Sequence, residues 1–230
     1  MQNIKFRRKL YINLFLLILL TSYNNHNIQI KNFFKIDKIR IINEGHLLDN
    51  SFISKLKLNL NFLIGNNIFL FDKTYVSKIL NAEEFIDKYE LVVNYPDSIT
   101  LKVAQAYPIA FIGSKNQYFG NNYKILNLDQ EKLKFDFNNL PIIYGSPTPK
   151  DFENLINDIN LSKIKYQDIA YFNFHNSKRW DIGLNNKIKI KLPFLNIVNS
   201  LDIADKIIKK NGLLIQSTID LTIDGQIIIS

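Results

Sequence analysis

The chain has 230 residues, of which 47% are hydrophobic, and it contains no cysteine. This length accommodates one large or two small domains, and without cysteine the chain can form no disulfide, thiolate nucleophile or cysteine-ligated zinc site. The net charge is +8, but Lys5, Arg7, Arg8 and Lys9 contribute half of it. No dense basic stripe with interleaved aromatic residues follows, which argues against nucleic-acid binding.

A short basic tail, residues 1–9, precedes an apolar stretch. No formal charge occurs from Leu10 to Ile30, and the densely apolar part ends near Tyr23. As a helix that part measures about 21 Å, a length typical of a signal peptide and shorter than the hydrocarbon core of about 30 Å. No A-x-A-like cleavage site follows. We therefore expect an uncleaved transmembrane anchor over residues 10–30, with a cleaved signal peptide or a buried helix as the alternatives.

The next segment predicts a small α+β unit with the element order β-α-α-β-β. A strand is expected over 34–41, and apolar residues at helical spacing follow over 52–63. Asp72 can cap a second short helix. Two alternating segments within 85–105 form a hairpin around Pro96, which presets the backbone for a turn. Two helices on one face of a three-stranded sheet is the economical layer arrangement.

Residues 33–105 resemble a POTRA domain, a small module that precedes many extracytoplasmic assembly proteins. The resemblance rests on Gly65…Asn67-Ile68-Phe69…Asp72, on Tyr95-Pro96-Asp97-Ser98-Ile99 and on Val103…Pro108.

Residues 106–230 predict a second α+β unit, with a mostly antiparallel sheet and flanking helices. Helices are expected over 149–160 and 195–210, with Gly212 at the end of the second. Asp224-Gly225, between alternating apolar residues, predicts a closing hairpin.

Another hairpin is predicted after the single tryptophan, Trp180. A loop of three residues would pair Leu184 with Ile188 and Ile182 with Ile190, which keeps one face of both strands apolar. A loop of two residues would instead mix lysines into that face.

Taken in order, these segments resemble the bacterial cell division protein family FtsQ, called DivIB in Gram-positive bacteria, over residues 5–230. After the basic tail, the apolar stretch and the POTRA-like unit, the motifs are Leu140-Pro141, Arg179-Trp180-Asp181-Ile182, Lys189-Ile190-Lys191-Leu192-Pro193 and Ile219-Asp220-Leu221. The resemblance implies a non-enzymatic divisome scaffold that links early and late division proteins at the septum and helps control septal peptidoglycan synthesis. It also implies a single-pass protein of the cell inner membrane, with the bulk of the chain in the periplasm.

The resemblance further implies that the last strand receives a strand from FtsB, which pairs with FtsL. An apolar, uncharged strand at a sheet edge offers unpaired N–H and C=O groups for such a contact, unless another strand of the same unit covers it. By position, the binding role falls on Gln226, Ile227, Ile228, Ile229 and Ser230, with Leu221, Thr222 and Ile223 as supporting neighbours. A candidate recruitment surface in the POTRA unit is Phe69, Leu70 and Phe71, for which core packing is the alternative.

No catalytic, cofactor-binding or metal-binding set is predicted. His26, His46 and His175 are interpreted as surface residues, because no HExxH motif or i,i+4 histidine pair is present. Nucleophile-elbow and phosphate-loop motifs are also absent. We therefore expect a protein that binds other proteins by shape, with no cofactor, no nucleic acid and no small-molecule substrate.

Two other functions remain open. A POTRA-containing envelope assembly or secretion factor would bind unfolded outer-membrane proteins, but only one POTRA-like unit is seen and no series of barrel strands of about 10 residues follows. A cell-wall hydrolase would need paired acids in a cleft or a metal site, and the sequence offers no convincing set.

Overall fold

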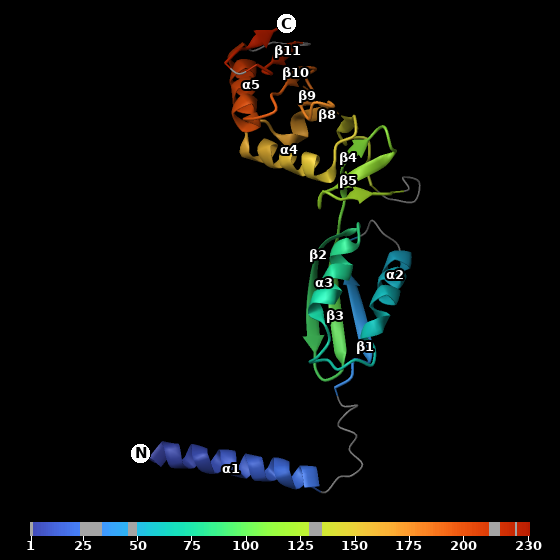
Figure 1. Cartoon of the computed structure of the whole chain (residues 1–230), viewed down its shortest axis with the longest axis vertical. Coiled ribbons are helices and arrows are strands. Elements are labelled where there is room, and N and C mark those ends of the chain that lie inside the picture. Colours follow the sequence, from blue (N-terminus) through green and yellow to red (C-terminus); the bar gives the residue numbers. More distant parts are fainter. Residues whose placement is uncertain (1, 24–33, 46–49, 129–134, 212–216, 224) are drawn as a thin grey trace.

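The computed structural model describes residues 2–23, 34–45, 50–128, 135–211, 217–223 and 225–230. Figure 1 shows an N-terminal helix, a small unit built on three strands, and a larger unit that continues to the C-terminus. The N-terminal helix, α1 (Gln2–Tyr23), includes the basic tail, and its side chains from Leu10 to Thr21 are exposed.

The predicted transmembrane anchor over residues 10–30 is wrong, and with it the single-pass, inner-membrane localisation. Among the residues that the structure describes, no helix is both long enough and apolar enough to cross a membrane. Because Lys5, Arg7, Arg8 and Lys9 lie inside α1, its uncharged part extends only about 21 Å, against about 30 Å for a hydrocarbon core. The expected periplasmic placement rested on that anchor.

The first unit has the predicted β-α-α-β-β order. Its elements are β1 (Lys38–Asn43), α2 (Asn50–Leu60) with the 3₁₀ turn η2 (Asn61–Leu63), α3 (Lys73–Ala82), β2 (Ile86–Asn94) and β3 (Ser98–Gln105). The strand order is β1-β3-β2, with β1 parallel and β2 antiparallel to β3. As predicted, Asp72 caps α3, since its Oδ1 accepts hydrogen bonds from the N–H groups of Thr74 and Tyr75 at 2.9 and 3.0 Å.

The core of the first unit lies between its sheet and the two helices. It is formed by apolar side chains of α2, η2, α3 and the central strand, which are Leu56, Leu60, Leu63, Val76, Leu80, Ile99, Leu101 and Val103. The alternating burial along β3 shows that one face of the sheet is covered and the other is not.

The second unit is built on one sheet of nine strands, with helices α4 and α5 packed on it (Figure 1). Its elements are β4 (Pro108–Ile112), β5 (Gln117–Gly120), β6 (Ile125–Leu126), β7 (Ile142–Tyr144), α4 (Pro149–Leu161), the 3₁₀ turn η4 (Tyr166–Asp168), β8 (Ile169–Phe174), β9 (Trp180–Leu184), β10 (Lys189–Lys191), α5 (Ile197–Asn211), β11 (Thr218–Asp220) and β12 (Ile228–Ile229). The strand order is β12-β11-β10-β9-β8-β7-β4-β5-β6.

The large sheet is mixed: five of its eight strand pairs are antiparallel, in line with the expected mostly antiparallel sheet, and three are parallel. The pairs β4–β7, β7–β8 and β10–β11 are parallel. A parallel pair needs a long crossover connection that returns the chain to the same end of the sheet. Helices supply it for two of the pairs, because α4 joins β7 to β8 and α5 joins β10 to β11, while the chain between β4 and β7 includes β5 and β6.

The register predicted for the 180–192 hairpin is confirmed. Ile182 pairs with Ile190, and the N–H of Leu184 donates to the carbonyl of Ile188 at 2.8 Å. The loop residue with positive φ is Lys187, at 67°. The apolar face packs in the core beneath the two helices, in a row of fully buried residues that crosses the sheet through Ile143, Phe172, Ile182, Ile190 and Ile219.

Candidate functional site

The strand β12 ends the sheet order and, among the described residues, it pairs on one side only, with β11. The N–H of Thr218 donates to the carbonyl of Ser230 at 2.7 Å, and the N–H of Ser230 donates back at 3.1 Å. Residues of an antiparallel pair alternate between hydrogen-bonded and non-hydrogen-bonded positions. Ile229, which lies opposite Ile219, is therefore at a non-hydrogen-bonded position. Its main-chain N–H and C=O point away from β11, to the free edge of the sheet.

The edge is accessible along its whole length. The side chains of Ile227, Ile228 and Ile229 are 51, 51 and 44% exposed, and Gln226 and Ser230 are also exposed. Within the described part of the chain, no strand covers the outward side of β12. Of the two interpretations that the sequence left open, the structure therefore shows the uncovered edge, which is the geometry that accepts a strand from another chain.

The supporting residues lie partly outside a strand. β11 ends at Asp220, because its Oδ1 accepts hydrogen bonds from the N–H and the hydroxyl of Thr222 at 3.1 and 2.7 Å, which turns the chain. Leu221 is buried, whereas Ile223 is 55% exposed. Asp224, predicted to begin the closing turn, lies outside the described residues, and Gly225 adopts φ 73°.

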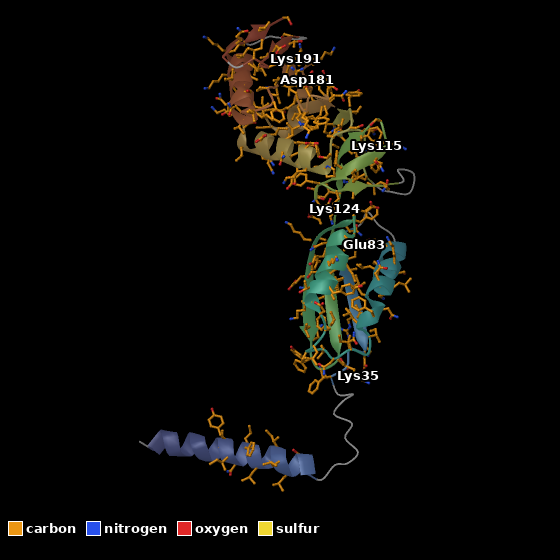
Figure 2. All side chains as sticks on the ribbon, in the orientation of Figure 1. Lys35, Glu83, Lys115, Lys124, Asp181 and Lys191 are labelled. Atoms are coloured by element: carbon orange, nitrogen blue, oxygen red, sulfur yellow. The ribbon has the colours of Figure 1, made fainter. Side chains whose placement is uncertain are left out.

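Charged side chains line the face of the sheet that is opposite to α4 and α5. Figure 2 marks Asp181 and Lys191 near the C-terminal end of the molecule. Lys191 Nζ donates to Asp220 Oδ2 at 3.0 Å, beside the edge strand. The hydrogen bond from the Thr222 hydroxyl, together with Lys191, lowers the pKa of Asp220 from 3.8 to about 2. This carboxylate therefore stays charged at neutral pH and fixes the end of β11.

Asp181 is the most deeply buried charged residue on this face, with an exposed fraction of 2%. Its Oδ2 lies 2.9 Å from Lys189 Nζ and 3.0 Å from His175 Nε2. His175, expected at the surface, is thus a half-buried neighbour of a carboxylate. His26 and His46 lie outside the described residues. Among those described, no group of three or more histidine or acidic side chains is arranged to hold a metal ion.

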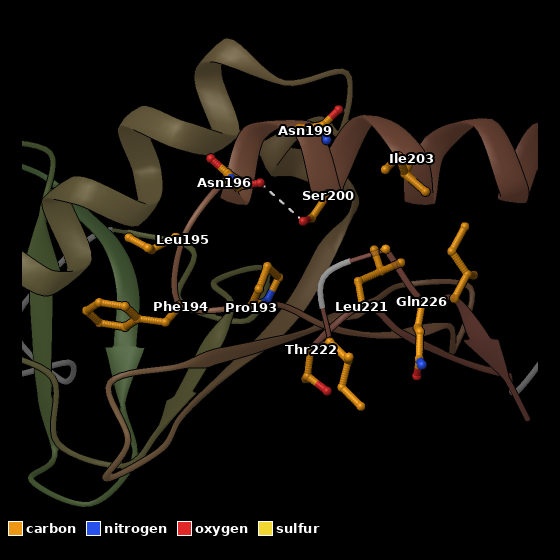
Figure 3. A pocket seen from close by; sticks show the side chains of 13 residues that line it. Pro193, Phe194, Leu195, Asn196, Asn199, Ser200, Ile203, Leu221, Thr222 and Gln226 are labelled. Carbon is orange, nitrogen blue, oxygen red and sulfur yellow. Dashed lines mark hydrogen bonds between the residues drawn. The ribbon is translucent and has the colours of Figure 1, made fainter.

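An open groove of about 380 Å³ lies beside the connection that leads from β11 into β12 (Figure 3). Its wall comes from the loop before α5, the first turns of α5 and the connection between β11 and β12. Phe194 and Leu195 are 59 and 69% exposed, and Ser200 Oγ donates to the carbonyl of Asn196 at 3.1 Å, which orders the start of the helix. The apolar pair Phe194-Leu195, next to Pro193, is the one sequence signal for this groove. Nothing in the sequence indicates that this pair lies near the residues that lead into the last strand.

The candidate recruitment surface in the first unit divides into two parts. Phe71 is in the core, whereas Phe69 and Leu70 are 57 and 81% exposed. The ring of Phe69 stacks on the ring of Tyr95, with 5.0 Å between the ring centroids, and meets the ring of Phe34 edge-on, with 5.1 Å between the centroids. Tyr95, which the sequence assigned only to a turn, therefore belongs to the same exposed aromatic surface as Phe69.

No protein-family model matches the chain, and no curated protein resembles it closely enough to assign a family.

Proposed function

We propose that the chain is a non-enzymatic divisome scaffold that links early and late cell division proteins. It binds an FtsB/FtsL-like pair by strand addition at β12 and helps control septal peptidoglycan synthesis. The observation that carries the proposal is the uncovered β12 edge, with its outward-pointing N–H and C=O at Ile229. The identity of the partners comes from the resemblance of the ordered sequence motifs to the FtsQ family.

The β12 edge suits strand addition in two ways. Its segment 226–230 carries no charged side chain, so nothing in it repels a second strand. The groove next to the residues that lead into β12 is lined by apolar groups, including Phe194, Leu195 and Ile227. In strand addition the main-chain hydrogen bonds supply affinity, while pockets for alternate side chains supply specificity. We therefore expect the partner strand to place apolar side chains toward this groove.

The first unit has a less receptive edge. Both of its outer strands are charged, since β2 carries Asp87, Lys88 and Glu90 and β1 carries Lys38 and Arg40. Charged side chains on an edge strand discourage pairing with another chain. The alternative function, an envelope assembly or secretion factor, would need the POTRA-like unit to take up unfolded strands. The charges on β2 favour the β12 edge, and with it the scaffold.

The test measures binding of the purified chain to the co-purified FtsB–FtsL pair of the same organism by isothermal titration calorimetry. Ile229→Pro removes the N–H that points to the free edge, while Ile229→Ala shortens the side chain and keeps that N–H. Because a lost hydrogen bond and a disturbed edge together exceed about 1.4 kcal/mol, we expect Ile229→Pro to weaken binding at least about tenfold. Ile229→Ala should weaken it less.

Trp180 fluorescence and far-UV circular dichroism check that both variants remain folded. If Ile229→Pro binds as tightly as the unmodified chain, strand addition at this edge is wrong. If the unmodified chain does not bind the pair at all, the scaffold function itself is wrong.

A further inference from the structure

The two units are joined by a very short connection. β3 ends at Gln105 and β4 begins at Pro108, so Ala106 and Tyr107 alone lie between the two strands. A connection through one point leaves the angle between two domains free to vary, and relative motion is the default expectation unless a further interface opposes it. The structure contains such an interface, formed by the turn between β5 and β6.

Two side chains of this turn reach into the first unit. Asn122 Nδ2 donates to the carbonyls of Glu84 and Ile86, both at 2.9 Å. Lys124 Nζ donates to the carbonyls of Asn81 and Glu83, at 2.6 and 2.8 Å. Figure 2 shows Lys124 at the level where the two units meet, next to Glu83. All four acceptors are main-chain groups at the end of α3 and the start of β2.

The position of Lys124 is favourable because α3 ends at Ala82. The last carbonyls of a helix lack partners within the helix and carry partial negative charge. A cation from the second unit therefore completes a helix of the first. Partial burial lowers the pKa of Lys124 from its usual 10.5, against the opposing effect of Glu83 and Asp87, which is consistent with a partly covered amine where the two units meet.

The turn is shaped to present these two side chains. Asn122 Oδ1 accepts a hydrogen bond from the N–H of Lys124 at 3.1 Å, so one amide group orders the turn and bridges the units. Gly120 leaves the space that this requires, because a Cβ atom there would lie 2.6 Å from Asn122 Oδ1.

The two units also share an apolar contact, in addition to the hydrogen bonds of Asn122 and Lys124. Phe85 packs against the core of the first unit, where its ring meets Phe52 edge-on at 6.0 Å. It also packs against a small buried cluster of the second unit, which contains Tyr118 and Leu126. The N–H of Ala106 donates to the Phe85 carbonyl at 2.9 Å. The joint therefore has a buried centre as well as a hydrogen-bonded margin.

We propose that Lys124 and Asn122 act as a clamp that makes the two units one rigid body. The clamp would hold two distant surfaces at a fixed separation. Lys35 and Asn67 pair through an isolated backbone β-bridge close to the Phe69 surface. Lys35 lies at the end of the first unit away from Lys124 (Figure 2). The strand β12 lies toward the opposite end of the molecule. A partner seated at one surface is thereby positioned relative to a partner at the other.

The absence of cysteine makes a distance measurement simple. Spin labels are attached to cysteines introduced at Leu58 in α2 and Leu161 in α4, both 75% exposed, and the distance distribution in the full chain is recorded by double electron–electron resonance. We expect one narrow distribution. Lys124→Met combined with Asn122→Ala should broaden it at least about twofold, because domains without a fixing interface move independently.

Lys115→Met is the matched control, since Lys115 is an exposed lysine in the neighbouring turn between β4 and β5, and it should leave the distribution unchanged. A broad distribution in the unmodified chain would overturn the proposal whatever the variants do. A clamp variant that stays folded by circular dichroism and as narrow as the unmodified chain would also overturn it. Because the measurement uses no partner, its outcome is independent of the proposed function.

Discussion

Tyr171 lies directly against Gly183 on the face of the large sheet opposite to α4 and α5. The two residues are paired between β8 and β9, and a Cβ atom at position 183 would lie 1.9 Å from Tyr171 Cε1. The Tyr171 ring also meets Tyr144 edge-on at 6.0 Å. Tyr171 thus covers Gly183 on this face, and all five residues of β9 are buried.

This contact predicts a coupled effect of two substitutions. Gly183→Ala should reduce the free energy of unfolding by about 1–3 kcal/mol, because the ring of Tyr171 must move to admit the methyl group. In a Tyr171→Ala background the same change should cost less than about 0.5 kcal/mol. Urea unfolding followed by Trp180 fluorescence measures both values. Equal costs in the two backgrounds would contradict the contact.

Asp181 should contribute more to stability than an exposed ion pair does. Asp181→Ala leaves Lys189 and His175 without their carboxylate, and we expect a loss of about 2–3 kcal/mol in the free energy of unfolding. Glu153→Ala is the control, because its partner Lys150 is 71% exposed, and should cost at most about 0.5 kcal/mol. The hypothesis fails if urea unfolding gives the same loss for both variants.

Asp220 predicts a pH dependence of stability. Its pKa is lowered from 3.8 to about 2 in the folded chain, so its stabilising contribution is complete above pH 4 and is lost as the pH falls toward 2. Because the group is partly exposed to solvent, we expect a contribution of about 1 kcal/mol at most. Asp220→Asn should remove this part of the acid dependence between pH 4 and 2. If the free energy of unfolding depends on pH in the same way in the variant and in the unmodified chain, this contribution of Asp220 is wrong.

Truncation of two neighbouring residues of the first unit should change its stability by very different amounts. Phe71→Ala removes a buried ring and should cost about 3 kcal/mol, whereas Leu70→Ala removes a side chain that is 81% exposed and should change stability by less than about 0.5 kcal/mol. Thermal unfolding of the two variants provides the comparison. A large loss for Leu70→Ala would mean that this residue packs more tightly than its exposure indicates.

Features controlled by neighbouring residues could be predicted from the sequence. Only one register of the 180–192 hairpin leaves the same face of both strands apolar, so alternation alone selected the pairing of Ile182 with Ile190. Asp72 could be identified as a helix cap because its carboxylate acts on N–H groups two and three residues later. The β-α-α-β-β order of the first unit followed from similar local patterns.

Features that depend on distant segments could not be predicted in this way. The acceptors of Lys124 are main-chain carbonyls about 40 residues earlier, and a carbonyl carries no sequence signature. The parallel pairing of β10 with β11 depends on how α5 packs, which periodicity does not reveal. The membrane anchor failed for a different reason: within the described residues, the uncharged part of α1 is only about 21 Å long.

The shortness of β12 affects how a partner would bind. Its two residues are attached to the three of β11 and make few main-chain hydrogen bonds, and such parts of a sheet open locally at low free-energy cost. Amide hydrogens of 218–220 and 228–230 should therefore exchange with solvent faster than those of β9. A strand added to β12 would slow exchange in β11 as well, so association would be coupled to ordering of the edge and would weaken in variants that loosen β11.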